Sequence, residues 1–205
     1  DSLKSKLGGR PVIEISTSIN GSKVSWNNEN APVTIAVNYT PTAAELADPE
    51  HIVVWYIDGS GNIIPVPDGR YDPATGKVTF TTTHLSKYAV SYVRKTFNDI
   101  GKYTWAKTEI EVLASKGIIN GTTATTFNPA TSITRADFMA LLIKALSLTA
   151  AVDTNFGDVK PGDYYYNAVG IAKRLGITNG TGGERFDPRA LITRQDAMVL
   201  VDKAM

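Results

Sequence analysis

Cysteine is absent from this chain, and histidine, another residue type that often holds metals, is scarce. Without cysteine among its 205 residues, the chain has no disulfide, no zinc–thiolate site and no thiol nucleophile. Its two histidines, His51 and His84, have a spacing unlike that of metal-binding pairs. We therefore expect no metal site and no cofactor.

An excess of charge of one sign is lacking too, as is any long apolar run. The 21 Lys and Arg residues nearly balance the 20 Asp and Glu residues, leaving a formal net charge of +1. Such a chain has no broad electrostatic field to attract nucleic acid or an anionic membrane. No apolar stretch approaches the length needed to cross a bilayer. We expect neither nucleic-acid binding nor membrane insertion, and any charged ligand requires a local site.

Motifs of catalysis and export are also missing. The sequence contains no Gly-x-Ser-x-Gly elbow, phosphate loop or dinucleotide-binding loop. Its acidic residues are scattered along the chain, so the sequence gives no more evidence for a glycosidase-type pair of carboxylates than chance would. The chain begins at Asp1 without the charged and apolar regions of a signal peptide, and we interpret it as a mature or trimmed segment. We expect no enzymatic activity here, and any catalysis of the parent protein on an upstream domain.

The first half of the chain has the pattern of short β-strands. Seven runs rich in Val, Ile, Thr and Tyr are separated by turn clusters; they cover residues 11–16, 22–26, 33–39, 51–57, 62–66, 77–83 and 87–93. This spacing is typical of an antiparallel β-sandwich, which we expect over residues 1–94. Thr42 and Glu45 have the spacing of a capping box, which predicts a short helical turn over residues 42–47.

The second half of the chain repeats itself. Equivalent elements are separated by 59 residues throughout, as Phe97 is from Phe156, so no insertion or deletion divides the copies. The elements of the first copy are Phe97-x-Asp99, Gly117-Ile118, Asn120-Gly121-Thr122, Phe127-x-Pro129 and Ile133-Thr134-Arg135-x-Asp137. Those of the second are Phe156-x-Asp158, Gly176-Ile177, Asn179-Gly180-Thr181, Phe186-x-Pro188 and Ile192-Thr193-Arg194-x-Asp196. Such a repeat indicates supersecondary units whose apolar faces need neighbours.

Each copy predicts two helices joined by an irregular loop. Helical spacing and end signals place them at residues 103–116 and from residue 134 in the first copy, and at 163–175 and 193–204 in the second. An apolar stripe marks the inward face of the second helix in each copy: Met139, Leu142, Ile143 and Leu146 in the first, and Met198, Val201 and Met205 in the second. The fold class is therefore an all-β module followed by an all-α pair of helix–loop–helix repeats.

A Thr-Arg-x-Asp motif opens the second helix of each copy. Thr134 with Asp137, and Thr193 with Asp196, have capping-box spacing, so a structural role explains these four residues. Capping does not explain the arginine between them, because a cation at a helix N-terminus opposes the helix dipole.

Two interpretations of the repeated arginines, Arg135 and Arg194, stay open on chemistry alone. One is a structural salt bridge to Asp99, to Asp158 or to an acid of the neighbouring repeat. The other is an anion site, in which a guanidinium beside free helix N-terminal amides binds a carboxylate or phosphate.

Aromatic residues and glycines also recur at equivalent positions. Trp105 and Tyr164 stand near the start of the first helix in each copy, where an aromatic ring either covers the core or stacks on a sugar. Gly121 and Gly180 follow that helix; turn geometry explains them, and a glycine also lets a ligand approach the backbone.

Taken together, the repeated elements resemble the S-layer homology domain, and the resemblance covers residues 97–152 and 156–205. It implies non-covalent attachment of an exported bacterial protein to the cell wall, and hence an extracellular location at the wall or surface layer. The implied ligand is an anionic secondary cell-wall polysaccharide, often pyruvylated.

The resemblance also implies roles for particular residues. The family's Thr-Arg-Ala-Glu motif falls on residues 134–137 and 193–196, with Asp in place of Glu in both copies. Its ligand-binding arginine falls on Arg135 and Arg194, which we expect to pair with ligand carboxylates. We expect the remaining ligand contacts to come from Trp105, Tyr164, Gly121 and Gly180.

The family usually has three repeats, whereas this sequence shows two, and we expect that a third repeat or another chain completes the assembly. A self-assembly or protein-docking module is therefore the alternative function. Residues 51–92 resemble small β-modules that precede such repeats, for which we expect a supporting role. Trp55 and Tyr56 alternate across a strand, so a carbohydrate-binding face is the alternative for this module.

Overall fold

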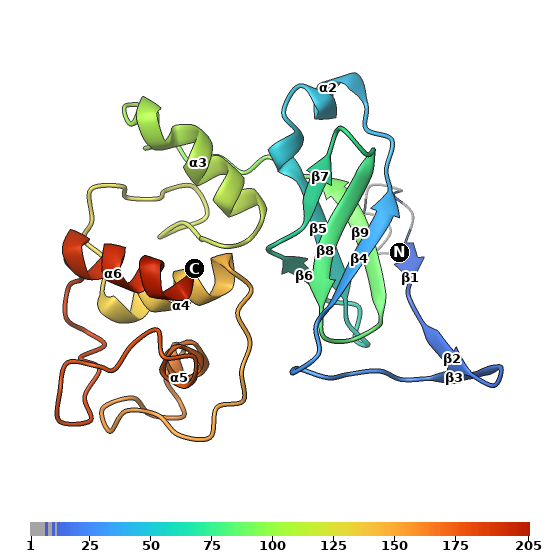
Figure 1. The fold of residues 1–205 in the computed structure, drawn as a ribbon. Coiled ribbons are helices and arrows are strands. Elements are labelled where there is room, and N and C mark those ends of the chain that lie inside the picture. Colours follow the sequence, from blue (N-terminus) through green and yellow to red (C-terminus); the bar gives the residue numbers. More distant parts are fainter. Residues whose placement is uncertain (1–6, 8–9, 11) are drawn as a thin grey trace. The chain divides into compact units, whose positions relative to one another are not determined.

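The computed structural model of this chain describes residues 7, 10 and 12–205 (Figure 1). The chain divides into two compact units, Asp1–Pro129 and Ala130–Met205. The division falls in the loop between the two helices of the first copy. The first helix of that copy thus belongs to the unit with the strands. The three-part division into residues 1–94, 97–152 and 156–205 follows the sequence repeat and stays a prediction.

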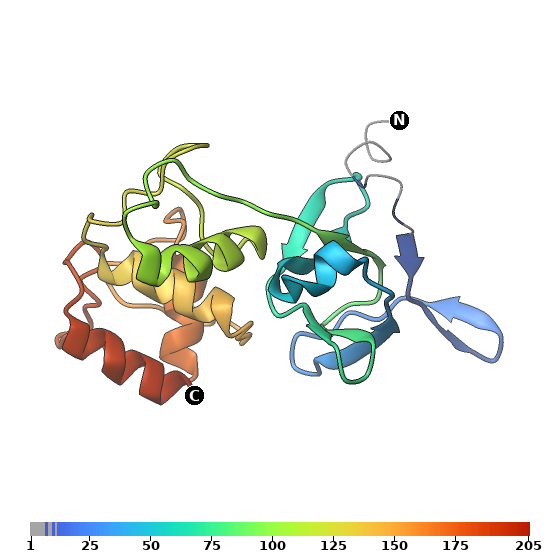
Figure 2. The same ribbon diagram turned by 90° about the horizontal axis from the view of Figure 1, so that it is seen from above.

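Two antiparallel sheets and a hairpin make up the β-module. The first sheet has the strand order β1 (Val12–Glu14), β9 (Lys87–Tyr92), β5 (Ile52–Ile57) and β6 (Ile63–Val66). The second has the order β4 (Val33–Asn38), β8 (Lys77–Thr82) and β7 (Arg70–Asp72). Strands β2 (Thr17–Ile19) and β3 (Ser22–Val24) pair with each other, and Figure 2 shows their hairpin projecting from the other strands.

Both sheets contribute side chains to one core. Alternation along β4 and β8 directs every second residue inward. The buried members of the core are Ile52, Val54, Tyr88 and Val90 from the first sheet and Tyr71, Val78 and Phe80 from the second. The predicted class, a β-module followed by helices, is confirmed. The finer description of a sandwich stays a proposal.

Each predicted run contains an observed strand, although Pro11, at the start of the first run, lies outside the described residues. Two short strands, β2 and β7, were not predicted. β7 contains the charged residues Arg70 and Asp72, so its sequence does not have the pattern of a strand. It forms a strand because it pairs with β8. The predicted capping box is present at α2 (Ala43–Leu46), where Thr42 and Glu45 exchange hydrogen bonds of 3.3 and 2.8 Å.

Four longer helices follow the strands along the chain: α3 (Thr104–Ser115), α4 (Arg135–Ala145), α5 (Tyr166–Arg174) and α6 (Arg194–Ala204). Helix α5 begins three residues later than predicted, because residues 160–166 form turns first. Asp163 Oδ2 accepts a hydrogen bond of 2.7 Å from the Lys160 amide, and the Tyr166 amide donates to the Asp163 carbonyl at 2.9 Å.

The second unit is built around α4, α5 and the loop of the second copy. Its buried core includes Met139, Leu142, Ile143, Val169, Ala172, Phe186 and Leu200. The apolar stripe predicted for α4 is buried except for Leu146. The equivalent prediction for α6 is wrong, because Met198, Val201 and Met205 are exposed. The rest of the unit covers Leu200 but leaves these three side chains open to solvent.

Among residues 7, 10 and 12–205, no helix combines the length and apolar character needed to cross a membrane. Over the same residues, no three His, Cys, Asp or Glu side chains gather as potential metal ligands.

Candidate functional site

The repeated Phe-x-Asp motif anchors the loop between the two helices of each copy. Asp158 accepts hydrogen bonds of 2.9 Å from the amides of both Phe186 and Asp187. Asp99 does the same in the first copy, accepting from Phe127 at 2.9 Å and from the next amide at 2.7 Å. The hydrogen bond from the Phe127 amide is the main reason that the pKa of Asp99 lies below its usual value. Both carboxylates thus bind backbone amides.

The predicted capping box is complete at the motif that opens α4, whereas at the motif that opens α6 only the contact made by the threonine side chain is present. Thr134 Oγ1 accepts from the Asp137 amide at 3.1 Å, and Asp137 Oδ2 accepts from the Thr134 amide at 3.2 Å. At α6, Thr193 Oγ1 accepts from the Asp196 amide at 3.1 Å. These contacts fix the start of each helix.

The N-terminal amides of α4 are already occupied. The Arg135 amide donates to the Ala190 carbonyl at 2.8 Å, and the Ala136 amide donates to the Pro188 carbonyl at 3.1 Å. The expectation of free amides beside Arg135 is therefore wrong, because the loop of the second copy folds over this helix end and supplies acceptors. An anion cannot use these two amides.

The repeated arginines have different surroundings. Arg135 is 8% exposed, its Nε donates to the Phe186 carbonyl at 3.0 Å, and its guanidinium carbon lies 5.0 Å from the centre of the Phe186 ring. Its Nη1 lies 3.8 Å from Oδ2 of Asp196, an acid of the neighbouring repeat. Arg194 is exposed at the start of α6. Repetition of the motif therefore does not repeat the environment of the arginine.

The two equivalent aromatic residues lie at the surface, which excludes the interpretation that they cover the core. Trp105 is 80% exposed and Tyr164 is 73% exposed. The Tyr164 hydroxyl donates a hydrogen bond to Oδ1 of Asp137. Asp137, a capping residue of α4, therefore holds the Tyr164 side chain in place. Partial burial and this hydrogen bond raise the pKa of Tyr164 to about 12. Burial acts to raise the pKa of Asp137, but hydrogen bonds from Thr134 and Tyr164 outweigh it and lower that pKa.

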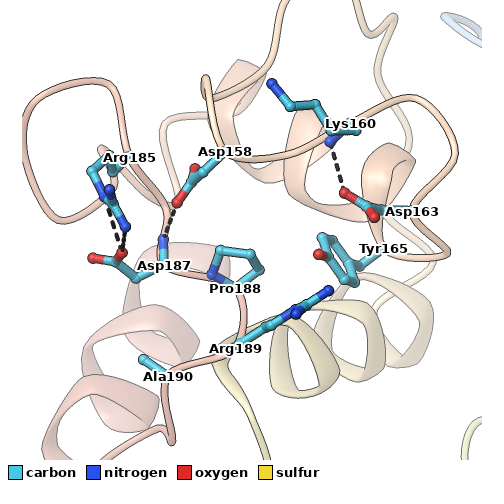
Figure 3. Close-up of a pocket in the computed structure, with 9 residues that line it drawn as sticks. All are labelled: Asp158, Lys160, Asp163, Tyr165, Arg185, Asp187, Pro188, Arg189 and Ala190. Carbon is cyan, nitrogen blue, oxygen red and sulfur yellow. Dashed lines mark hydrogen bonds and ion pairs between the residues drawn. The ribbon is translucent and has the colours of Figure 1, made fainter.

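Tyr164 borders a surface cleft of about 460 Å³. Its lining consists of Thr134, Ala136, Asp137, Gly162, Asp163, Tyr164, Tyr165, Pro188 and Arg189. An adjoining cleft of about 390 Å³ shares Asp163, Tyr165, Pro188 and Arg189, and adds Asp158, Lys160, Arg185, Asp187 and Ala190 (Figure 3). We call the two together the Arg189 cleft. It lies wholly within the second unit.

Figure 3 shows how the charged side chains of the Arg189 cleft lie. Arg185 is paired with Asp187, its Nη2 lying 2.7 Å from Oδ1, whereas Arg189 extends toward the ring of Tyr165. Burial and the nearby Asp163 raise the pKa of Tyr165, and the nearby Arg189 acts to lower it. The cleft therefore offers guanidinium groups, carboxylates and phenol rings together. This set suits a ligand that carries both an anionic group and hydroxyls.

Comparison with known families agrees with this arrangement of two repeats. The model of the S-layer homology domain matches residues 96–139 and 155–198. This chain carries two tandem S-layer homology domains. The first match spans the boundary between the two compact units, and the second lies within the second unit.

Curated relatives share these domains. The chain is 35% identical over 203 residues to an amylopullulanase of Thermoanaerobacterium thermosulfurigenes, covering 97% of this chain and 11% of the relative. It is 43% identical over 110 residues to exoglucanase XynX of Acetivibrio thermocellus, covering 53% of this chain and 10% of the relative. It is 37% identical over 107 residues to a surface-layer 125 kDa protein of Lysinibacillus sphaericus, covering 52% of this chain and 9% of the relative.

The chain thus spans about a tenth of the length of these relatives. S-layer homology domains are anchoring modules of the cell wall, and the extracellular, wall-associated location predicted from the sequence is confirmed.

The structure brings only some of the predicted site residues together. Tyr164 lines the Arg189 cleft. Arg135 instead donates a hydrogen bond to the Phe186 carbonyl in the loop of the second copy. Gly121 lines a separate cleft of about 230 Å³ in the first unit. At Gly180 the φ angle is +77°, and an added Cβ would lie against the Arg185 carbonyl and the Phe156 ring. Packing within the second domain's loop therefore requires this glycine.

Sequence reasoning missed Arg189, Lys160 and Tyr165, because it searched for what the two copies share. The equivalents of these residues in the first copy are Ala130, Gly101 and Ala106. Positions where two close copies differ sharply in charge or aromatic character were the available signal.

Proposed function

We propose that these domains attach an exported bacterial protein to the cell wall by binding an anionic, pyruvylated secondary cell-wall polysaccharide without a covalent bond. The Arg189 cleft is the observation that carries this proposal, because it combines cationic groups with an exposed aromatic side chain held by Asp137. Relatives named as surface-layer proteins support the wall as the place of attachment.

In this proposal the ligand carboxylate pairs with Arg189, and Lys160 contributes a second positive charge. A sugar ring stacks on Tyr164, which is exposed enough to present its face. Sugar hydroxyls donate to the carboxylates of Asp137 and Asp163, which border the same cleft. Stacking and hydrogen bonding then bind the neutral sugars of the polymer, and the carboxylate of the pyruvyl group provides the negative charge.

The residues predicted from the sequence keep their proposed places in the ligand contacts. Arg194 is exposed and available to an anion, and Trp105 offers a second sugar platform in the first domain. Gly121 lies beside Phe97 and Gly180 beside Phe156, and both remain proposed backbone contacts of the ligand.

Arg135 has two possible roles in binding, and a pair of variants distinguishes them. If it contacts ligand directly through its charge, Arg135→Lys should retain part of the binding. If it acts by donating from Nε to the Phe186 carbonyl, lysine cannot reproduce that geometry. Arg135→Lys should then weaken binding nearly as much as Arg135→Ala.

The testing experiment is sedimentation of the chain with purified cell-wall sacculi, before and after their secondary polysaccharide is removed. We expect binding to disappear with the polymer, and Arg189→Ala to weaken it by about tenfold or more. Arg174→Ala is the matched control, because Arg174 is an exposed arginine of the same unit outside the cleft. A further arm uses polymer from which pyruvate has been removed by mild acid. Undiminished binding to that polymer would contradict the pyruvylated ligand but not the wall polysaccharide.

A second candidate function, protein docking, is favoured by the exposed face of α6. Met198, Val199 and Leu191 lie open to solvent on or beside this helix. We propose that a further repeat, in the same chain or another, covers this face as the second copy covers α4. Sedimentation equilibrium tests it: concentration-dependent association that Met198→Asp abolishes supports docking between chains. If the chain stays monomeric, adding a third repeat in tandem should protect the α6 amides from hydrogen exchange.

We also propose that residues 1–94 form a β-sandwich that supports the anchor and that the chain itself has no catalytic activity. The enzyme names of two relatives belong to much longer proteins, of which this chain matches only 11% and 10%. Assay of the chain on pullulan and xylan should give no product. Trp55→Ala should leave sacculus binding unchanged, and a loss of binding would favour a carbohydrate-binding face on the β-module.

A further inference from the structure

The last turn of α3 lies against the β-module within the first unit, and Ser115 is at the centre of that contact. Ser115 is buried, with its Oγ 2.9 Å from Nδ1 of the buried His51. The same oxygen accepts from the Lys95 amide at 3.0 Å and donates to the Glu111 carbonyl at 2.7 Å. His51 Nδ1 also lies 3.0 Å from the Val93 carbonyl. A single hydroxyl thus joins the helix, the segment that follows β9 and the short helix η1 (Pro49–His51).

Lys116 makes the next contact along the chain. Its Nζ donates to the Gly69 carbonyl at 2.9 Å and lies 3.6 Å from Glu50 Oε2. Only 11% of its side chain is exposed, and burial lowers the pKa of its ammonium. A buried lysine needs acceptors for its charge, and here both acceptors belong to the β-module.

Gly117 completes the contact through its backbone. It has a φ of +69°, and a Cβ added there would lie 2.6 Å from Cγ of Pro65 on β6. Any side chain at this position would therefore push the helix end away from the strand.

The second copy has the same helix end without such a contact. Arg174 and Leu175 occupy the positions of Ser115 and Lys116, and both are largely exposed. Gly176 also has a positive φ, of +75°, yet nothing lies within 4 Å of an added Cβ. Helix termination accounts for a glycine in both copies, whereas the serine and lysine occur only where a β-module is contacted.

We infer that the β-module is a specific receptor for the C-terminal end of α3, so that it caps the first S-layer homology domain and selects that domain over the second. An arginine at position 115 has no room in the buried space beside His51. A leucine at position 116 leaves the Gly69 carbonyl and Glu50 without their donor. The β-module is therefore not an interchangeable spacer, and it fixes which repeat begins the array.

Exchange of residues between the copies tests this inference in the whole chain. Ser115→Arg and Lys116→Leu place the residues of the second copy into α3. Arg174→Ser and Leu175→Lys make the reverse change in α5 and serve as matched controls. Hydrogen exchange followed by mass spectrometry reports on each helix separately.

We expect the first pair of variants to speed exchange by about tenfold or more, both in α3 and in residues 49–52 and 67–70 of the β-module. The control pair should leave α5 unchanged. Ser115→Ala, a smaller change, keeps the test valid if Ser115→Arg does not fold, since it removes the acceptor for the Lys95 amide. Unchanged exchange in α3, or an equal increase in α5 of the controls, would overturn the inference.

Discussion

Met139 and Met198 occupy the same position of the repeated second helix, yet Met139 is completely buried and Met198 is 73% exposed. Leu142 and Val201 show the same contrast one turn later. The difference does not come from the helices, which have nearly the same sequence pattern. It comes from what packs on them: the α5 helix and loop of the second copy lie over α4.

This contrast predicts unequal costs for the same substitution. Met139→Ala should lower the free energy of unfolding by about 2–5 kcal/mol, because it leaves a cavity in the core. Met198→Ala should change it by less than about 0.5 kcal/mol, because the side chain is already in solvent. Urea denaturation of both variants provides the measurement. A large cost for Met198→Ala would mean that another copy of the chain covers α6 in solution.

The Tyr164–Asp137 hydrogen bond predicts a change in stability at high pH. The pKa of Tyr164 is raised from 10.0 to about 12 in the folded chain. Its contribution to stability is therefore complete below pH 10, declines as pH rises from there, and is lost above about pH 12. Tyr164→Phe should remove this part of the pH dependence. The difference in tyrosinate absorbance between the two proteins isolates the titration, and a midpoint near 10 would contradict the contact.

The same variant has a consequence at low pH. The pKa of Asp137 is lowered despite burial, and the Tyr164 hydroxyl is one of the donors responsible. A lowered folded-state pKa stabilises the fold above the unfolded value and loses that contribution as pH falls through the folded value. In Tyr164→Phe the pKa of Asp137 should rise. Carboxyl-carbon NMR titration measures it, with Tyr165→Phe as a neighbouring control.

Asp158 predicts a local effect on the loop of the second domain. Asp158→Ala removes the acceptor from the amides of Phe186 and Asp187, so their hydrogen exchange should accelerate by about tenfold. Asp99→Ala should act in the same way on Phe127 and Asn128. Asp202→Ala, an exposed acid on α6, provides the control. Unaltered loop exchange would show that the surrounding packing alone holds these loops.

His84 predicts a weakening of the β-module in acid. Burial lowers the pKa of His84 below 6.5, and its Nε2 is buried without a hydrogen-bond partner among the described residues. The neutral form is thus favoured in the fold, and stability should decline as pH falls from about 6.5 through the folded-state pKa. Denaturation at about pH 7 and about pH 5 tests this. His84→Gln should reduce the difference between the two, and an unchanged difference would assign it to other groups.

The elements that local sequence determines were predicted well. The Thr134–Asp137 cap and the Thr42–Glu45 cap both form, because their donors and acceptors lie within one helical turn. The short strand β7 was missed, since its three residues carry no alternation and depend on β8 for their pairing. The start of α5 was placed three residues too early, because the turns at Asp163 end just before it.

The candidate site was less accessible to sequence reasoning. Arg135 was singled out correctly as needing an explanation beyond capping, but the sequence left its partner open. Its contact with the Phe186 carbonyl joins residues 51 positions apart, and no local pattern encodes that. Arg189 was overlooked, because its position in the first copy is an alanine.

The sequence by itself determined the repeat, the two helices of each copy, their caps and the loop glycines. These features arise from contacts between near neighbours and from the periodicity of apolar residues. The tertiary structure decided which copy of each repeated residue is buried, which side chains surround the Arg189 cleft, and that α3 ends against the β-module. Two copies of one sequence pattern acquire different environments, because burial depends on the neighbours that long-range folding brings to each.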